Sequence, residues 1–305
     1  MIPHSLPAIA AVLLAAAAPA RSAILVQELF DGIAGAPPGT SSTLDGKSPT
    51  SSSIGLAGNW SVNDSPATIF TASNFNVDSD LPGAASYAGT PGGLWRNGGN
   101  NWSTNIHAVA PLATTIDFNN DQTLYFSVRL KNSGDTSMGI GLVAGSGASA
   151  EFVGAGFSWS TATSIDGASG DANNAAYTSH GTLGANSGIY GIRAHEAANN
   201  VNGFGLLIGR ITISSSGADL IDIVRYAPDS TIDADPSSVT WSASSSYDPS
   251  MVASHLLLWL NGSGDGKLDA IRFGESWADV TAVPEPAAAT LDALGALALL
   301  RRRRA

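Results

Sequence analysis

The 305-residue sequence contains no cysteine. Disulfide bonds, a thiol nucleophile and a thiolate zinc site are therefore excluded. Positive charge is scarce too, because residues 24–282 carry 9 Lys and Arg against 23 Asp and Glu, a net charge of about −14. A surface of this sign repels phosphate backbones, so we expect no nucleic-acid partner.

Motifs of the common catalytic and metal sites are also missing. The sequence has no Gly-x-Ser-x-Gly elbow, no phosphate loop and no His-x-x-x-His pair. Its histidines are scattered, which is more typical of buried or solvent-exposed side chains than of a metal site. We predict no catalytic residues and no cofactor.

The N-terminus has the pattern of an export signal. Residues 8–18 form an apolar run, and Ala18, Pro19 and Ala20 make a small-residue cleavage site. The alternative is a buried N-terminal helix, but the run has no polar face and stops at a Pro/Arg/Ser junction. We therefore assign residues 1–23 to a signal peptide cleaved near Ala20.

The C-terminus combines a proline motif, an apolar run and an arginine cluster. The motif consists of Val283, Pro284, Glu285 and Pro286, whose prolines prevent a helix from running through this point. Residues 287–300 are apolar apart from a threonine and Asp292, and the cluster consists of Arg301, Arg302, Arg303 and Arg304. This order predicts a hydrophobic helix that stops in a membrane, although a full span needs about 20 apolar residues.

Together the two ends resemble the PEP-CTERM family of sorting-signal proteins. The resemblance implies that a membrane-embedded exosortase, a cysteine-dependent transpeptidase-like enzyme, recognises residues 283–305 in a Gram-negative bacterium that makes extracellular polysaccharide. It also implies transient residence in the inner membrane and export to the cell envelope, cell surface or extracellular matrix. The short apolar run and Asp292 depart from the family pattern, so we expect weak or brief membrane retention.

The region between the signals has the pattern of short strands. In residues 122–130, Leu124, Phe126, Val128 and Leu130 alternate with polar or larger residues, which is the period of a strand with one buried face. Similar runs are residues 24–30, 138–144, 151–159, 203–214, 220–226, 255–260 and 268–273. Since no sustained helical period separates them, we predict one all-β domain over residues 24–282, a two-sheet antiparallel jelly-roll sandwich.

Both ends of this domain resemble concanavalin A-like lectin/glucanase sandwiches. The matching stretches are ILVQELFDG at residues 24–32 and HLLLWLNGSGDGKLDAIRFGESWADV at residues 255–280. The resemblance implies that the first strand pairs with the last. The family's glucanases use a Glu-x-Asp-x-x-Glu strand, which is absent here, and no two of Glu28, Glu151, Glu196 and Glu275 have strand spacing.

One glycine-rich segment matches part of a calcium-loop template. Asn261, Ser263, Asp265 and Asp269 occupy the first, third, fifth and ninth positions. Arg272 occupies the twelfth position, where a carboxylate normally closes the cage. A turn between two strands is therefore favoured over a calcium site.

Two tryptophans are the sequence's only hint of a ligand. Trp95 and Trp102 flank the polar segment RNGGNN, which would place an aromatic platform beside amide donors, as sugar sites do. The favoured alternative makes them core anchors. We thus expect a surface protein with a non-catalytic structural or adhesive role, with extracellular polysaccharide as partner; a lectin-like binding module and a glycan-cleaving enzyme are the alternatives.

Overall fold

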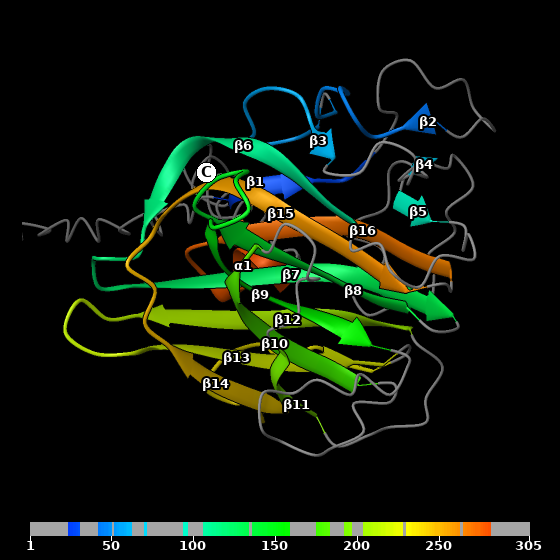
Figure 1. The fold of residues 1–305 in the computed structure, drawn as a ribbon. Helices are drawn as coiled ribbons and strands as arrows, with labels where there is room; N and C mark the ends of the chain where they lie inside the picture. The colour runs from blue at the N-terminus through cyan, green and yellow to red at the C-terminus, as the bar shows by residue number, and fades with distance from the viewer. Residues whose placement is uncertain are drawn as a thin grey trace, which may run out of the picture.

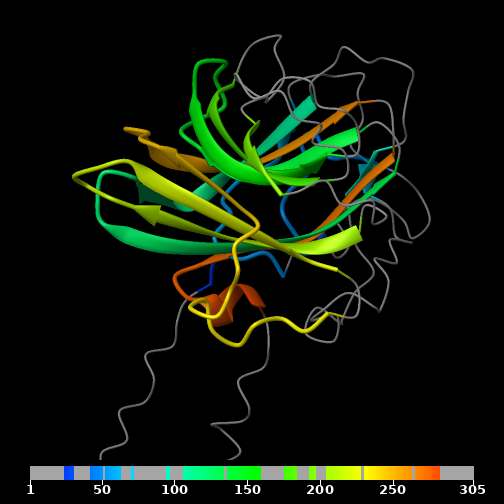
Figure 2. The same ribbon diagram turned by 90° about the horizontal axis from the view of Figure 1, so that it is seen from below.

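The strands form two antiparallel sheets packed face to face (Figure 1, Figure 2). The computed structural model describes residues 24–30, 42–50, 52–62, 70–71, 94–96, 106–133, 136–158, 175–183, 192–196, 204–227, 230–262 and 265–281. The predicted all-β sandwich is confirmed. The segments predicted to be a signal peptide and a sorting tail lie outside these ranges. Within the ranges, no helix has the length and apolar character needed to cross a membrane.

The larger sheet has nine strands. Its order is β14 (Ala243–Tyr247), β13 (Asp219–Tyr226), β12 (Phe204–Ile213), β7 (Gln122–Ser133), β16 (Asp265–Gly274), β5 (Leu94–Arg96), β4 (Phe70–Thr71) and β2 (Ser42–Thr43), and β1 (Ile24–Glu28) also pairs with β16. A one-turn helix, α1 (Trp277–Thr281), follows β16.

The smaller sheet has seven strands. Its order is β11 (Ile192–His195), β10 (Ala175–Thr182), β9 (Glu151–Ser158), β8 (Thr136–Val143), β15 (Val252–Gly262), β6 (Ile106–Asp117) and β3 (Ser61–Val62). All the predicted strand runs overlap observed strands, whereas the strands that were not predicted are β2, β3, β4, β5, β6, β10, β11 and β14.

The first and last strands of the domain, β1 and β16, pair as expected. In the β1–β16 ladder, Ile24 lies opposite Gly274 and Glu28 lies opposite Ile271. Because α1 follows β16 directly, residue 24 and the residues around α1 lie at the same end of the sandwich. This pairing ties down both ends of the described domain.

The core lies between the sheets. Leu124, Phe126, Val128 and Leu130 are all buried there, as their alternation predicted. The expected polar face of β7 is buried as well, since Ser127 is 0% exposed and Arg129 is 6% exposed. The prediction that only one face of this strand is buried is therefore wrong at its centre.

The outer face of the nine-stranded sheet is itself partly covered. A second apolar cluster there consists of Leu206, Ile208, Val224, Tyr226, Val239, Trp277 and Val280. Figure 2 shows α1 and the irregular segment before β14 packed beneath this sheet. The indole Nε1–H of Trp277 donates to the carbonyl oxygen of Asp233 at 2.7 Å, which fastens α1 to that segment.

Candidate functional site

A groove open to solvent lies at the end of the sandwich where β1 begins. Its volume is about 560 Å³. The walls are Ile24, Leu25, Val26, Gly55, Thr114, Thr115, Ile116, Asp117, Asn120, Asp121, Gln122 and Glu275. The groove thus has an apolar wall from β1 and a polar wall from the β6–β7 connection.

Local hydrogen bonds fix the polar wall. The carboxylate of Asp117 accepts the backbone N–H of Asn119 at 2.9 Å and the side-chain amide of Asn120 at 2.7 Å. This bond to the residue two positions ahead is the turn chemistry of aspartate. Asp121 accepts the backbone N–H of Ser215 at 2.6 Å, which joins the groove to the β12–β13 turn.

The groove carries three carboxylates in its walls. The hydrogen bond from the backbone of Asn119 lowers the pKa of Asp117, and that from the backbone of Ser215 lowers the pKa of Asp121, so both stay ionised at neutral pH. Glu275 adds a third, exposed carboxylate. Within the described ranges, none of the three forms a salt bridge with a Lys or Arg.

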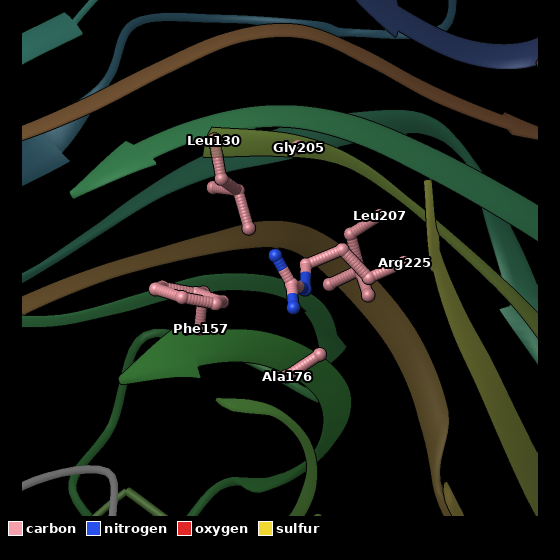
Figure 3. A pocket seen from close by; sticks show the side chains of 6 residues that line it. All are labelled: Leu130, Phe157, Ala176, Gly205, Leu207 and Arg225. Atoms are coloured by element: carbon pink, nitrogen blue, oxygen red, sulfur yellow. The ribbon is translucent and has the colours of Figure 1, made fainter. Parts of the chain in front are cut away.

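A second pocket, between the two sheets, has no room for a ligand. Figure 3 shows its lining residues, Leu130, Phe157, Ala176, Gly205, Leu207 and Arg225. Its space is too narrow for even one water molecule. Arg225 crosses this interior, lies 5.3 Å from the centre of the Phe157 ring, and donates to Glu196 at 2.7 Å. This pocket therefore surrounds a structural ion pair.

The outer face of the seven-stranded sheet is filled by its own aromatic side chains. Gly139 and Gly156 carry no side chain, and the rings of Trp259 and Tyr177 occupy the space above them. Trp259 is 1% exposed and Tyr177 is 0% exposed. Both rings are consequently core residues rather than a platform for a ligand.

The segment LDAIRFG at residues 268–274 has structural roles. The register of β16 shifts between Asp269 and Arg272, and Ala270 in this bulge has a φ of 51°. Asp269 accepts the backbone N–H of Ala270 at 2.6 Å, and Arg272 donates to the side chain of Gln27 at 2.9 Å. A side chain at Gly274 would collide with Asp279. The motif shapes a bulge and attaches β1 and α1.

The segment that partly matches a calcium loop connects β15 to β16, in agreement with the favoured turn interpretation. Asn261 lies near the end of β15 and Asp265 begins β16, in the other sheet, while Ser263 lies outside the described residues. Asp269 is 7% exposed and serves the bulge. Among the described residues, no group of three His, Asp or Glu side chains is placed to hold a metal ion. Calcium binding stays the untested alternative to the turn.

The two candidate sugar-binding tryptophans are only partly placed. Trp95 belongs to β5, where its backbone lies opposite Lys267 of β16 and Phe70 of β4. Trp102 lies outside the described residues. Sequence reasoning missed the groove instead, although the Asp, Asn and Thr cluster between two strands was a signal for it.

Comparisons with known proteins give remote structural likenesses. No family model matches the chain, and no curated protein matches it. Similar solved structures include the globular domain of T. cruzi calreticulin (TM-score 0.41, 10% identity, 80% of this chain and 95% of that one). Others are a beta-1,3-glucanase from Mycobacterium marinum (0.35, 12%, 82% and 98%) and the Ca2+-bound exoplasmic/lumenal domain of VIP36 (0.34, 8%, 63% and 83%).

Proposed function

We propose that the chain is an exported, surface-sorted β-sandwich protein that binds extracellular polysaccharide without cleaving it. Sorting is supported by the motif at residues 283–286, the apolar run after it and the arginines at 301–304. Binding is supported by the groove between β1 and the β6–β7 connection. An exosortase-type membrane enzyme is the proposed processing partner, and the role of the sandwich is structural or adhesive.

The groove offers the two kinds of surface that a sugar requires. Carboxylates such as Asp121 accept hydrogen bonds from hydroxyl groups, and amides such as Asn120 both donate and accept them. The apolar wall formed by Ile24, Leu25 and Val26 suits the C–H faces of sugar rings. Because the groove is open to solvent, it can take a segment of a polymer that continues beyond its walls.

The electrostatics of the groove favour binding over cleavage. A glycosidase needs a carboxylic acid with a raised pKa beside an ionised carboxylate. The pKa values of Asp117 and Asp121 are both lowered. Among the described residues, the carboxyl groups with raised pKa values are those of Glu28 and Asp219, which are buried outside the groove. Glu28 accepts a hydrogen bond from the Ser53 hydroxyl, and Asp219 accepts one from the backbone N–H of Ser214.

The experiment is to follow the full-length protein on insoluble neutral glucan, measuring retention and release of reducing ends together. Thr115→Trp would place an indole ring in the groove from an exposed position in its wall. We expect retention of the wild type, at least tenfold weaker retention of the variant, and no reducing ends from either. A matched control is Thr240→Trp, because Thr240 is also exposed and lies outside the groove.

Three outcomes would contradict the proposal. Reducing ends that rise with protein concentration would indicate an enzyme. Equal retention of wild type and Thr115→Trp would place binding elsewhere on the molecule. Absence of retention on glucan, mannan and galactan alike would leave only a structural role.

A further inference from the structure

The two sheets approach each other along one edge of the sandwich, where β10 of the smaller sheet contacts β14, the edge strand of the larger sheet. Thr178 of β10 and Ser245 of β14 share a hydrogen bond of 2.8 Å between their hydroxyl groups. Two residues further along each strand, the rings of His180 and Tyr247 stack with centroids 4.1 Å apart and an interplanar angle of 16°. We call these two residue pairs the edge seam.

The imidazole of His180 is buried without hydrogen-bond partners. The residue is 6% exposed, and neither Nδ1 nor Nε2 has a partner within the described structure. A neutral ring tolerates this position because its flat face packs on Tyr247. A protonated ring would need two acceptors, and burying a charge without them is costly.

The groups around His180 come from four neighbouring strands. From β11, Arg193 reaches the backbone carbonyl of His180 at 3.4 Å. From β9, Glu151 accepts the hydroxyl proton of Tyr247 at 3.3 Å. From β13, Asp219 lies directly opposite Tyr247 of β14 in the strand register, and its carboxylate accepts the backbone N–H of Ser214 at 2.9 Å.

These neighbours make protonation of the ring unfavourable. Burial, and then the positive charge of Arg193, lower the pKa of His180 to about 4. Burial also raises the pKa of Tyr247 to about 12, so the Tyr247 hydroxyl keeps its proton throughout the acid range. His180 is accordingly neutral at pH 7, and its charge changes only when the surroundings become distinctly acidic.

We propose that His180 is an acid-sensitive latch that holds the two sheets together at the edge seam and releases them when its ring is protonated. Release of the seam would expose the inner faces of β10 and β14. The opposite edge of the sandwich, which contains β1, β6 and the groove, would stay closed. The latch is independent of the proposed glycan binding, since none of its residues lines the groove.

The lowered pKa of His180 determines how closure of the edge seam depends on pH. The folded-state pKa lies below the ordinary value of 6.5, so the unfolded or opened form binds more protons. Closure of the seam is therefore unaffected above about pH 6.5, weakens as the pH falls below 6.5, and reaches its full loss near pH 4.

Hydrogen exchange of the full-length protein between pH 7 and pH 4, corrected for intrinsic exchange rates, tests the latch. We expect protection of the amides in β10 and β14 to fall by about tenfold or more, as each pKa unit corresponds to a factor of ten. His180→Phe keeps a flat ring against Tyr247 without a titrating group and should remove this loss. His255→Gln is the control, because His255 lies on β15 of the same sheet and outside the seam.

Equal loss of protection in wild type and His180→Phe would overturn the proposal. Should that variant fail to fold, the ring signals of the wild-type histidines can be titrated by NMR instead. A His180 ring that titrates near 6.5 would overturn the latch, and one that stays neutral until about pH 4, with β10 and β14 amides broadening at the same point, would support it.

Discussion

The indole Nε1–H of Trp259 donates a hydrogen bond of 2.8 Å to the hydroxyl of Tyr177, although two strands separate these residues in the seven-stranded sheet. Trp259 lies on β15 and reaches over β8, and Tyr177 lies on β10 and reaches over β9. The Tyr177 hydroxyl also lies 2.6 Å from Ser137 Oγ. Glycines on the two central strands let both rings lie flat and meet.

Gly139→Ala should destabilise the sandwich. A Cβ at this position would lie 2.2 Å from the Trp259 ring and 2.4 Å from the Ala155 carbonyl oxygen. Because backbone as well as side chain must shift, we expect a loss of about 3 kcal/mol in the free energy of unfolding by urea, the upper end for overpacking. Gly145→Ala is the control, since nothing lies within 4 Å of its Cβ. Equal stability of the two variants would contradict the flat-ring packing.

Glu196→Ala should be destabilising because it leaves Arg225 charged in the interior. The side chain of Arg225 is 4% exposed and that of Glu196 is 10% exposed. Loss of one partner of a buried pair costs about 3–5 kcal/mol. The double variant Glu196→Ala, Arg225→Met should recover part of this loss, because no buried charge remains. A double variant less stable than Glu196→Ala alone would contradict this account, because removal of the remaining buried charge would then recover no stability.

Glu28 should make stability depend on pH. Burial raises its pKa above the ordinary 4.5, although hydrogen bonds from Phe30, Ser53 and Thr50 act in the opposite direction. A raised folded pKa gives stability that is present below pH 4.5 and is lost as the pH rises through the folded value. Glu28→Gln should thus gain stability relative to wild type between pH 4 and pH 7 in urea unfolding.

Asp117→Asn is the control of opposite sign for that experiment. Hydrogen bonds from Asn119 lower the pKa of Asp117, so its contribution is present above the ordinary value of 3.8 and is lost at lower pH. We expect the difference between this variant and wild type to stay constant from pH 5 to pH 7. A constant difference for Glu28→Gln as well would contradict the assignment of a raised pKa.

The charge of the groove should select among glycans. Three carboxylates in the walls repel uronic-acid polymers, so neutral glucan should bind at low salt and alginate should not. Glu275→Lys changes an exposed side chain and should raise alginate retention at 20 mM salt, an effect that disappears near 500 mM because salt screens exposed charges. Strong alginate binding by the wild type at low salt would contradict the groove as the site.

The strands whose faces alternate were predictable from the sequence, and the others were not. Leu124 to Leu130 show a period of two because one side of β7 always faces the core. β6 was not predicted because Pro111 interrupts its alternating pattern. The strand accommodates this proline beside a register shift in the β15–β6 ladder. The polar Ser127 and Arg129 suggested solvent, since no local pattern reveals that they are buried.

The groove was not predictable because its residues come from distant parts of the chain. Asp117 and Asp121 surround one turn, whereas Glu275 joins them only because β16 pairs with β1 and β7. The structural roles of Asp269 and Arg272 at the β16 bulge were not predictable either. The bulge at Ala270 depends on the strands that pair with β16 on both sides. The sequence pattern predicts strands, but pairing between strands determines which polar side chains share a surface.

Sorting is tested most directly by comparing the full-length protein with a version that ends at Ala282, both expressed in a host that makes exosortase and extracellular polysaccharide. Removal of residues 283–305 takes away the proline motif, the apolar run and the arginine cluster and leaves every described strand in place. We predict that the full-length protein is recovered in processed form with the surface polysaccharide and that the shortened one is released into the medium. Recovery of both in the same fraction and the same form would contradict sorting by the tail.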